Sequence, residues 1–142
     1  MKQLALTFAL SFTLLHTLAA AQNNTSKAAS AVRATVTDYI EAYYTGDAGR
    51  MKQTLHPHYL KHMIHGDIPM REKTGTQMVQ EVRSHGPADL PVANKTEQVS
   101  VLDIAGDIAS AKLVTPGWTD YMTLEKINGR WKILSVVQRI GN

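Results

Sequence analysis

The stretch from Trp118 to Arg139 reads WTDYMTLEKINGRWKILSVVQR, and it decides the class of fold. Two runs rich in β-branched and aromatic residues flank Asn128-Gly129. An Asn-Gly pair between two such runs is the strongest short signal of a β-hairpin. The chain should therefore end in two long antiparallel strands.

The two-residue turn also predicts the register of this hairpin, because it sets which residues lie opposite each other. Ile127 is expected to face Arg130, and Asp120 is expected to face Val137. Side chains alternate along a strand, so seven residues should share one face: Trp118, Asp120, Met122, Leu124, Ile133, Ser135 and Val137. Asp120 is the charged member of this mostly apolar face, which makes it a candidate functional residue.

A second hairpin-like pair of runs precedes the first. QVSVLDI at residues 98–104 and IASAKLV at residues 108–114 flank an Ala-Gly-Asp turn. Such runs between turn signals are typical of strands. We expect four strands in the C-terminal third.

Helical patterns occupy the region before these strands. Residues 26–45 carry an apolar stripe at helical spacing, and Gly46 is a natural helix end. Asp47 can cap a short second helix that stops near Pro57, and a third short helix is expected over residues 76–84. The predicted inward residues of the first helix are Val32, Val36, Tyr39, Ile40 and Tyr43. Helices followed by an antiparallel sheet predict an α+β fold with a curved sheet packed on about three helices.

The N-terminal 21 residues have the features of a secretory signal peptide. They read MKQLALTFALSFTLLHTLAAA, with an early lysine, an apolar run and small residues at the end. The run is shorter than the roughly 20 residues that a membrane span needs. We expect a signal peptide over residues 1–21 and an exported single domain over residues 22–142, periplasmic or secreted, with no membrane contact after signal removal.

Composition limits the partners and the chemistry. The sequence has no cysteine, so disulfides and thiol catalysis are excluded. The formal net charge is +3, and the basic residues are scattered along the chain. A nucleic-acid partner is therefore not expected.

Three stretches resemble the putative lumazine-binding family within the nuclear transport factor 2-like superfamily, also described as SnoaL-like or cystatin-like. They are YIEAYYTGDAGRMKQTLHP, VLDIAGDIASAKL and DYMTLEKINGRWKIL, and the resemblance extends from about Ala31 to Val137. It implies a cone-shaped α+β domain in which a highly curved sheet and three helices enclose an apolar pocket, often with a homodimer formed through the sheet. It does not imply one reaction, since the superfamily includes enzymes, ligand carriers and assembly modules.

Ketosteroid isomerases of the same superfamily use a tyrosine on the first helix as an oxyanion donor and a carboxylate after the second helix as a base. The resemblance places Tyr39 at the tyrosine position. The position of the base falls near Met63, where no acid stands. Isomerisation by that mechanism is therefore not expected.

Four histidines fall within HPHYLKHMIH at residues 56–65. In a helix, His58, His62 and His65 would share one face and could hold Zn²⁺. The resemblance instead begins a strand near Leu60, in which His62 and His65 point to opposite faces. We expect no metal and no other cofactor, and we keep open that His62 or His65 lies at the pocket rim as an acid or base.

Asp120 allows two interpretations. Buried on an apolar face, its carboxyl would have a raised pKa and could act as a base or bind a heterocycle. Alternatively, it lies at a sheet edge or pairs with a basic residue such as Arg139, which would make it structural.

Three functions remain open at this point. The first is a small-molecule-binding domain for a heteroaromatic, lumazine-like ligand, with these candidate contacts: Tyr39, Tyr43, Met63, Trp118, Asp120 and Met122. The second is an isomerase, dehydratase or hydrolase, with these candidate acid, base and oxyanion-binding residues: Asp120, Tyr39, His62 and His65. The third is an interaction module that dimerises through its sheet.

Overall fold

The computed structural model describes the backbone of residues 4–141 and the side chains of residues 24–141. The elements, in chain order, are α1 (Leu4–Thr45), α2 (Ala48–Thr54), β1 (Leu55–His65), β2 (Ile68–Thr74), α3 (Gly75–His85), the short 3-10 helix η1 (Val92–Asn94), β3 (Gln98–Ala105), β4 (Ile108–Val114), β5 (Trp118–Ile127) and β6 (Arg130–Ile140). Within the described residues, no helix combines the length and the apolar character that a membrane crossing requires. The predicted signal peptide falls where side chains are not described, and it stays a prediction.

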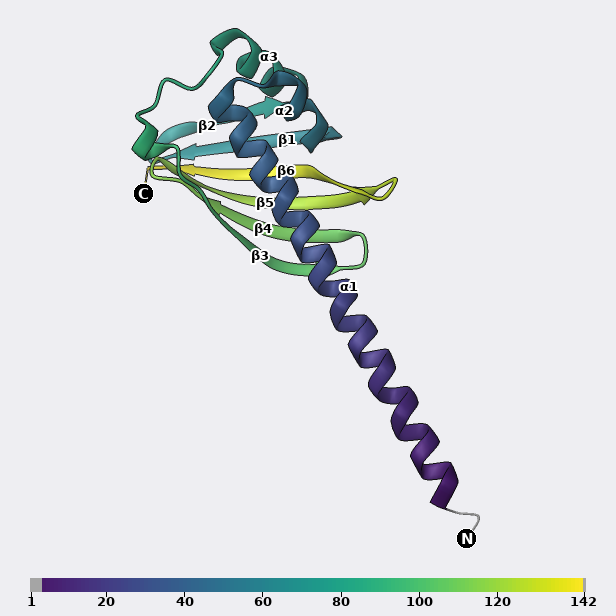
Figure 1. Cartoon of the computed structure of the whole chain (residues 1–142). Helices are drawn as coiled ribbons and strands as arrows, with labels where there is room; N and C mark the ends of the chain where they lie inside the picture. The colour runs from purple at the N-terminus through teal and green to yellow at the C-terminus, as the bar shows by residue number, and fades with distance from the viewer. Residues whose placement is uncertain (1–3, 142) are drawn as a thin grey trace.

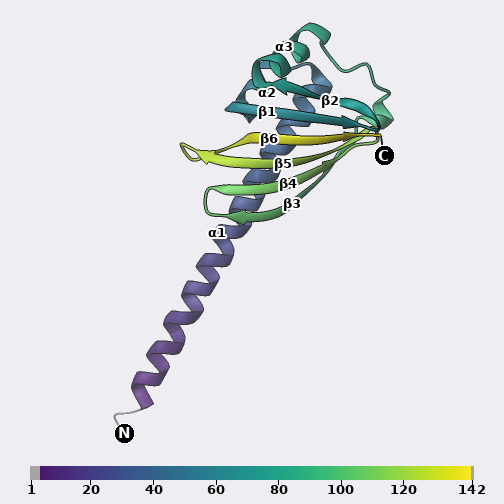
Figure 2. The same cartoon turned by 180° about the vertical axis from the view of Figure 1, so that it is seen from behind.

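The strands form one six-stranded sheet in the order β2-β1-β6-β5-β4-β3. Neighbouring strands are antiparallel except β1 and β6, which run parallel, so the sheet is mixed. In Figure 1, α1 crosses one face of the curved sheet, with α2 and α3 beside its β1–β2 end. Figure 2 shows the opposite face, which α1 does not cross. This is the predicted α+β architecture, with one parallel strand pair added.

The joint between α1 and α2 follows the predicted signals. Gly46 has φ 73°, and a side chain there would place Cβ only 2.3 Å from the backbone carbonyl carbon of Gly86. The Asp47 carboxylate accepts a hydrogen bond of 2.8 Å from the backbone N–H of Arg50, which caps α2. Close backbone approach and a cap therefore fix how α1 turns into α2.

The boundary between α2 and β1 lies earlier than predicted. The helix ends at Thr54, and Leu55 is already extended and pairs with Ile133 of β6. The predicted helix end near Pro57 and strand start near Leu60 are wrong, because pairing with β6 extends this segment. Pro69 lies in the edge strand β2, where a missing N–H is tolerated.

The core lies between α1 and the sheet. The α1 residues Val32, Val36, Tyr39 and Ile40 are all buried, as the helical spacing predicted. They belong to one apolar cluster with the following sheet and helix residues: Leu113, Met122, Leu124, Ile133, Val136, Met78 and Val82. Packing of the α1 stripe against the sheet therefore forms the core of the domain.

The C-terminal hairpin forms at the predicted turn. Asn128 has φ 49° and Gly129 has φ 77°, the left-handed geometry that an Asn-Gly turn favours. Ile127 faces Arg130, as predicted. The turn chemistry therefore sets the register near the tip.

Farther from the tip, a β-bulge next to Leu124 changes the register. Asp120 faces Gln138, and the predicted pairing with Val137 is wrong. One extra residue in β6 reverses the alternation of side chains along the rest of the strand. The inward residues of β6 beyond the bulge are Val136 and Gln138, whereas Ser135 is half-buried and Val137 is exposed.

Candidate functional site

A pocket of about 520 Å³ opens among α1, α3 and the strands β1, β2, β5 and β6. Four of the six predicted ligand contacts line it: Tyr39, Tyr43, Met63 and Trp118. Asp120 and Met122 are buried and do not line it. The structure thus brings most of the predicted set to one cavity and places Asp120 behind the cavity wall.

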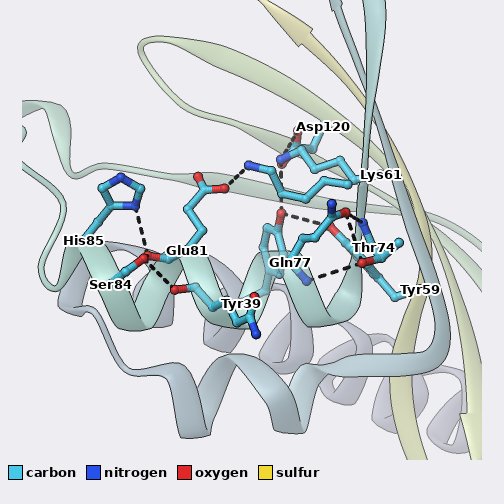
Figure 3. A network of polar contacts seen from close by, with 11 residues as sticks. Tyr39, Tyr59, Lys61, Thr74, Gln77, Glu81, Ser84, His85 and Asp120 are labelled. Carbon is cyan, nitrogen blue, oxygen red and sulfur yellow. Dashed lines mark hydrogen bonds and ion pairs between the residues drawn. The ribbon is translucent and has the colours of Figure 1, made fainter.

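A chain of polar side chains lies at this wall (Figure 3). The Lys61 ammonium donates a hydrogen bond of 3.2 Å to the Tyr39 hydroxyl, and that hydroxyl lies 3.4 Å from the Tyr59 hydroxyl. On its other side, Lys61 Nζ lies 3.7 Å from Asp120 Oδ1. The four side chains in this row of contacts are all buried: Tyr39, Tyr59, Lys61 and Asp120. The contacts therefore connect α1, β1 and β5 away from bulk water.

Lys61 is the residue that the sequence analysis missed. It lines the pocket and is 5% exposed. A signal was present: with Met63 placed at the pocket, two-residue alternation in a strand also turns Lys61 and Tyr59 inward.

Burial sets the protonation behaviour of Lys61. Loss of hydration lowers the pKa of its ammonium group, and the nearby Lys73 charge lowers it further. Asp120 and Glu81 favour the charged form and offset part of this effect. The neutral amine is therefore more accessible here than on an ordinary surface lysine.

Asp120 responds in the opposite sense. Burial raises the pKa of its carboxyl, while Lys61, Gln138 and Trp118 act to lower it. Lys61, Gln138 and Trp118 all present N–H groups to the carboxyl, which is how the two neutral side chains lower its pKa. Within the described residues these contacts fall short of full hydrogen-bond geometry, so the Asp120 oxygens and the Trp118 indole N–H have no partner of normal geometry. The predicted alternative partner Arg139 is exposed and lies opposite Thr119. The partner of Asp120 is Lys61, and neither the sheet-edge position nor the pairing with Arg139 is found.

Tyr39 remains a hydrogen-bonding phenol under ordinary conditions. Burial raises its pKa well above the usual value, and Tyr59 and Asp120 act in the same direction. The Tyr39 hydroxyl therefore keeps its proton and can donate to a ligand oxygen or to Tyr59. This agrees with its expected place at the pocket wall.

The histidine segment lies in β1, so the helical metal face of His58, His62 and His65 does not form. His56 Nε2 lies 3.1 Å from a Glu125 carboxylate oxygen. His62 Nε2 lies 3.1 Å from Glu72 on β2, and His65 is exposed at the strand end. None of the four histidines in residues 56–65 lines the pocket.

The acidic partners of His56 and His62 come from other strands, which the local sequence could not reveal. His56 itself is buried in β1. Within residues 24–141 no group of three or more metal-ligating side chains comes together.

The fold and the pocket define an α+β domain of the nuclear transport factor 2-like class. The chain belongs to the family described as "Putative lumazine-binding", whose match spans residues 27–138. A search of curated proteins gives no significant match.

Solved structures support the same class. A nuclear transport factor 2-like protein of unknown function from Silicibacter pomeroyi has a TM-score of 0.69 at 19% identity, covering 82% of this chain and 98% of that chain. A protein with a cystatin-like fold from Novosphingobium aromaticivorans has a TM-score of 0.59 at 11% identity, covering 87% and 88%. A ketosteroid isomerase-like protein from Erwinia carotovora atroseptica has a TM-score of 0.58 at 11% identity, covering 80% and 96%. At these identities the likeness shows the fold.

Proposed function

We propose that this protein is a small-molecule-binding domain whose ligand occupies the pocket and accepts a hydrogen bond from Lys61 or Tyr39. The observation that carries the proposal is the buried Lys61–Tyr39–Asp120 cluster beside the cavity. A buried ammonium group and a phenol with few acceptors of their own lose free energy unless a partner supplies hydrogen bonds. A ligand carbonyl or ring nitrogen next to Lys61 would supply one.

The pocket walls favour a flat ring. The ring centroids of Tyr43 and Trp118 lie 5.7 Å apart in an edge-on arrangement, and Met63 and Met78 line the same cavity. Polar and charged side chains such as Lys61, Arg71 and Gln138 share the lining with these apolar ones. A combination of apolar walls and convergent polar groups is typical of small-molecule sites. A heteroaromatic, lumazine-like compound with ring carbonyls is the ligand class we propose.

Native mass spectrometry tests this proposal. The protein, purified gently from its source organism without added ligand, should carry a reproducible extra mass. Met63→Trp places a large side chain in the pocket and should remove that mass. Ile64→Trp is the matched control, because the adjacent residue is 43% exposed and does not line the pocket. Retention of the mass by Met63→Trp would place the ligand elsewhere.

An acid–base enzyme is the second candidate. It is supported by a lysine and an aspartate whose pKa values burial shifts toward each other, a pattern common in active sites. Asp120 would act through Lys61, since it does not itself line the pocket. A protein that carries no extra mass would favour transient occupancy and therefore this alternative.

We also propose that the sheet forms a homodimer through the face that α1 does not cross. Tyr121 and Val137 lie opposite each other on β5 and β6 and are 51% and 44% exposed. Tyr121→Lys should then shift the molecular mass measured by light scattering from dimer to monomer. A monomeric parent protein at micromolar concentration would contradict this proposal.

Export is proposed separately. The features of residues 1–21 support cleavage before Gln22. N-terminal sequencing of the protein isolated from its source organism should begin at Gln22, and an intact N-terminus would contradict export by signal cleavage.

A further inference from the structure

We propose that Lys61 forms a reversible imine with an aldehyde or ketone in the pocket. This inference rests on the proposed function, because the carbonyl compound must first occupy that pocket. It goes further by assigning the ligand class as an electrophilic carbonyl and the contact as a covalent bond.

The position of the Lys61 amine, at the pocket wall and shielded from bulk water, suits it to act as a nucleophile. Lys61 Nζ has the Tyr39 hydroxyl at 3.2 Å and Asp120 Oδ1 at 3.7 Å, and the residue lines the cavity. Only 6% of its side chain is exposed. Exclusion of water favours the neutral amine and also limits hydrolysis of the product.

A second lysine in the same pocket sharpens the assignment. Lys73 lies directly opposite Lys61 in the β1–β2 ladder and also lines the cavity. It forms an ion pair with Glu81, and its side chain is 20% exposed. The Lys73 charge lowers the pKa of Lys61, and a neighbouring cation is one known way to activate a lysine nucleophile. Lys61 should react, and Lys73 should not.

The neighbours of Lys61 can move the protons that the step requires. The neutral amine attacks the carbonyl carbon, and the new carbon–nitrogen bond gives a carbinolamine. Nitrogen loses two protons in the course of the reaction, and the Tyr39 hydroxyl, 3.2 Å from Nζ, relays both to the former carbonyl oxygen, which leaves as water. The Asp120 carboxylate, 3.7 Å from Nζ, stabilises the positive charge on nitrogen while these transfers take place. One water is released for each imine formed, and nothing is oxidised or reduced.

The probe is 2,4-pentanedione, a small diketone whose imine rearranges to a conjugated enaminone with a near-ultraviolet absorption band. The full-length mature protein should form one such adduct at neutral pH, and peptide mapping should place it on Lys61. Lys61→Met should remove the adduct and most of the band, because the ordinary lysines that remain are charged at neutral pH. Lys126→Met, at an exposed lysine that does not line the pocket, is the matched control and should still form the adduct on Lys61.

Three results would overturn the proposal: no adduct, adducts only on surface lysines, or an unchanged rate in Lys61→Met. Peptide mapping of the unaltered protein keeps the test decisive if Lys61→Met does not fold. The native mass measurement separates this inference from the proposed function. A non-covalent ligand that Met63→Trp removes, together with an unreactive Lys61, would leave the binding function standing and exclude the imine.

Discussion

Two clusters of charged residues near α1 differ in almost every physical respect. Arg50 on α2 pairs with Asp38 and Glu41 on α1, and the three side chains are 34%, 49% and 41% exposed. Lys61 and Asp120 join β1 to β5 with side chains that are 6% and 0% exposed. The side chains of the first cluster keep much of their hydration, whereas those of the second have lost nearly all of it.

The difference indicates where function lies. An exposed pair contributes at most about 1 kcal/mol to stability and costs little to keep. A buried pair loses hydration that its mutual attraction does not always restore, so it is weak evidence for a stabilising role. Within the part of the chain that the structure describes, the Asp120 oxygens have no hydrogen bond of normal geometry, which adds to that cost. We therefore interpret the buried pair as serving the pocket beside it.

The largest expected effect comes from removing one partner of the buried pair. Lys61→Met leaves the Asp120 carboxylate without its cation, and the free energy of unfolding should fall by about 3 kcal/mol. The loss should lie at the low end for such pairs, because Asp120 can take up a proton. Urea unfolding at neutral pH measures it. The control Lys73→Met breaks the more exposed pair with Glu81 and should cost less than about 1 kcal/mol; equal losses would contradict the distinction by burial.

Removing both charges should cost less than removing one. In Lys61→Met/Asp120→Asn neither of the two buried positions carries a charge. We expect the double variant to recover about 2 kcal/mol of the single-variant loss. A double-mutant cycle with Asp120→Asn measures the coupling. Additive losses would mean that the two residues do not act as a pair.

The sequence was sufficient for most of the fold because the deciding signals are local. Helix spacing, the Gly46 stop, the Asp47 cap and the Asn128-Gly129 turn each act within a few residues, and each is confirmed. The bulge next to Leu124 was not predictable in this way, since it depends on how β6 packs between β1 and β5. Because of that single extra residue, Asp120 faces Gln138 in the hairpin and not Val137.

The site was predictable only in part, for the same reason. Tyr39, Tyr43, Met63 and Trp118 reach the pocket from faces that periodicity or family resemblance could assign. The pairing of Lys61 with Asp120 joins residues far apart in the chain through the order of strands in the sheet. No local pattern reports strand order, so the ion pair could be found only in three dimensions.

The buried cluster also includes Tyr39, whose burial should make the free energy of unfolding depend on pH in the alkaline range. The pKa of Tyr39 is raised in the folded state, mainly by burial, so above about pH 10 the unfolded chain loses this proton first and stability falls. Tyr39→Phe removes this contribution and should lose about 1 kcal/mol less than the parent between about pH 10 and pH 11. Urea unfolding at the two pH values measures the slope. Tyr121→Phe, on the exposed face, is the matched control, and parallel slopes for Tyr39→Phe and the parent would contradict the buried phenol.

The smallest effect is expected at the exposed cluster. Arg50→Met removes both ion pairs of α2 with α1 but leaves the cap intact, because the Asp47 carboxylate binds the backbone N–H of residue 50. The free energy of unfolding should fall by about 0.5 kcal/mol, and the difference should shrink further in about 1 M salt, where screening acts over about 3 Å. A salt-insensitive loss as large as that of Lys61→Met would mean that hydration does not separate the two clusters, and the link from the buried pair to the pocket would lose its physical basis.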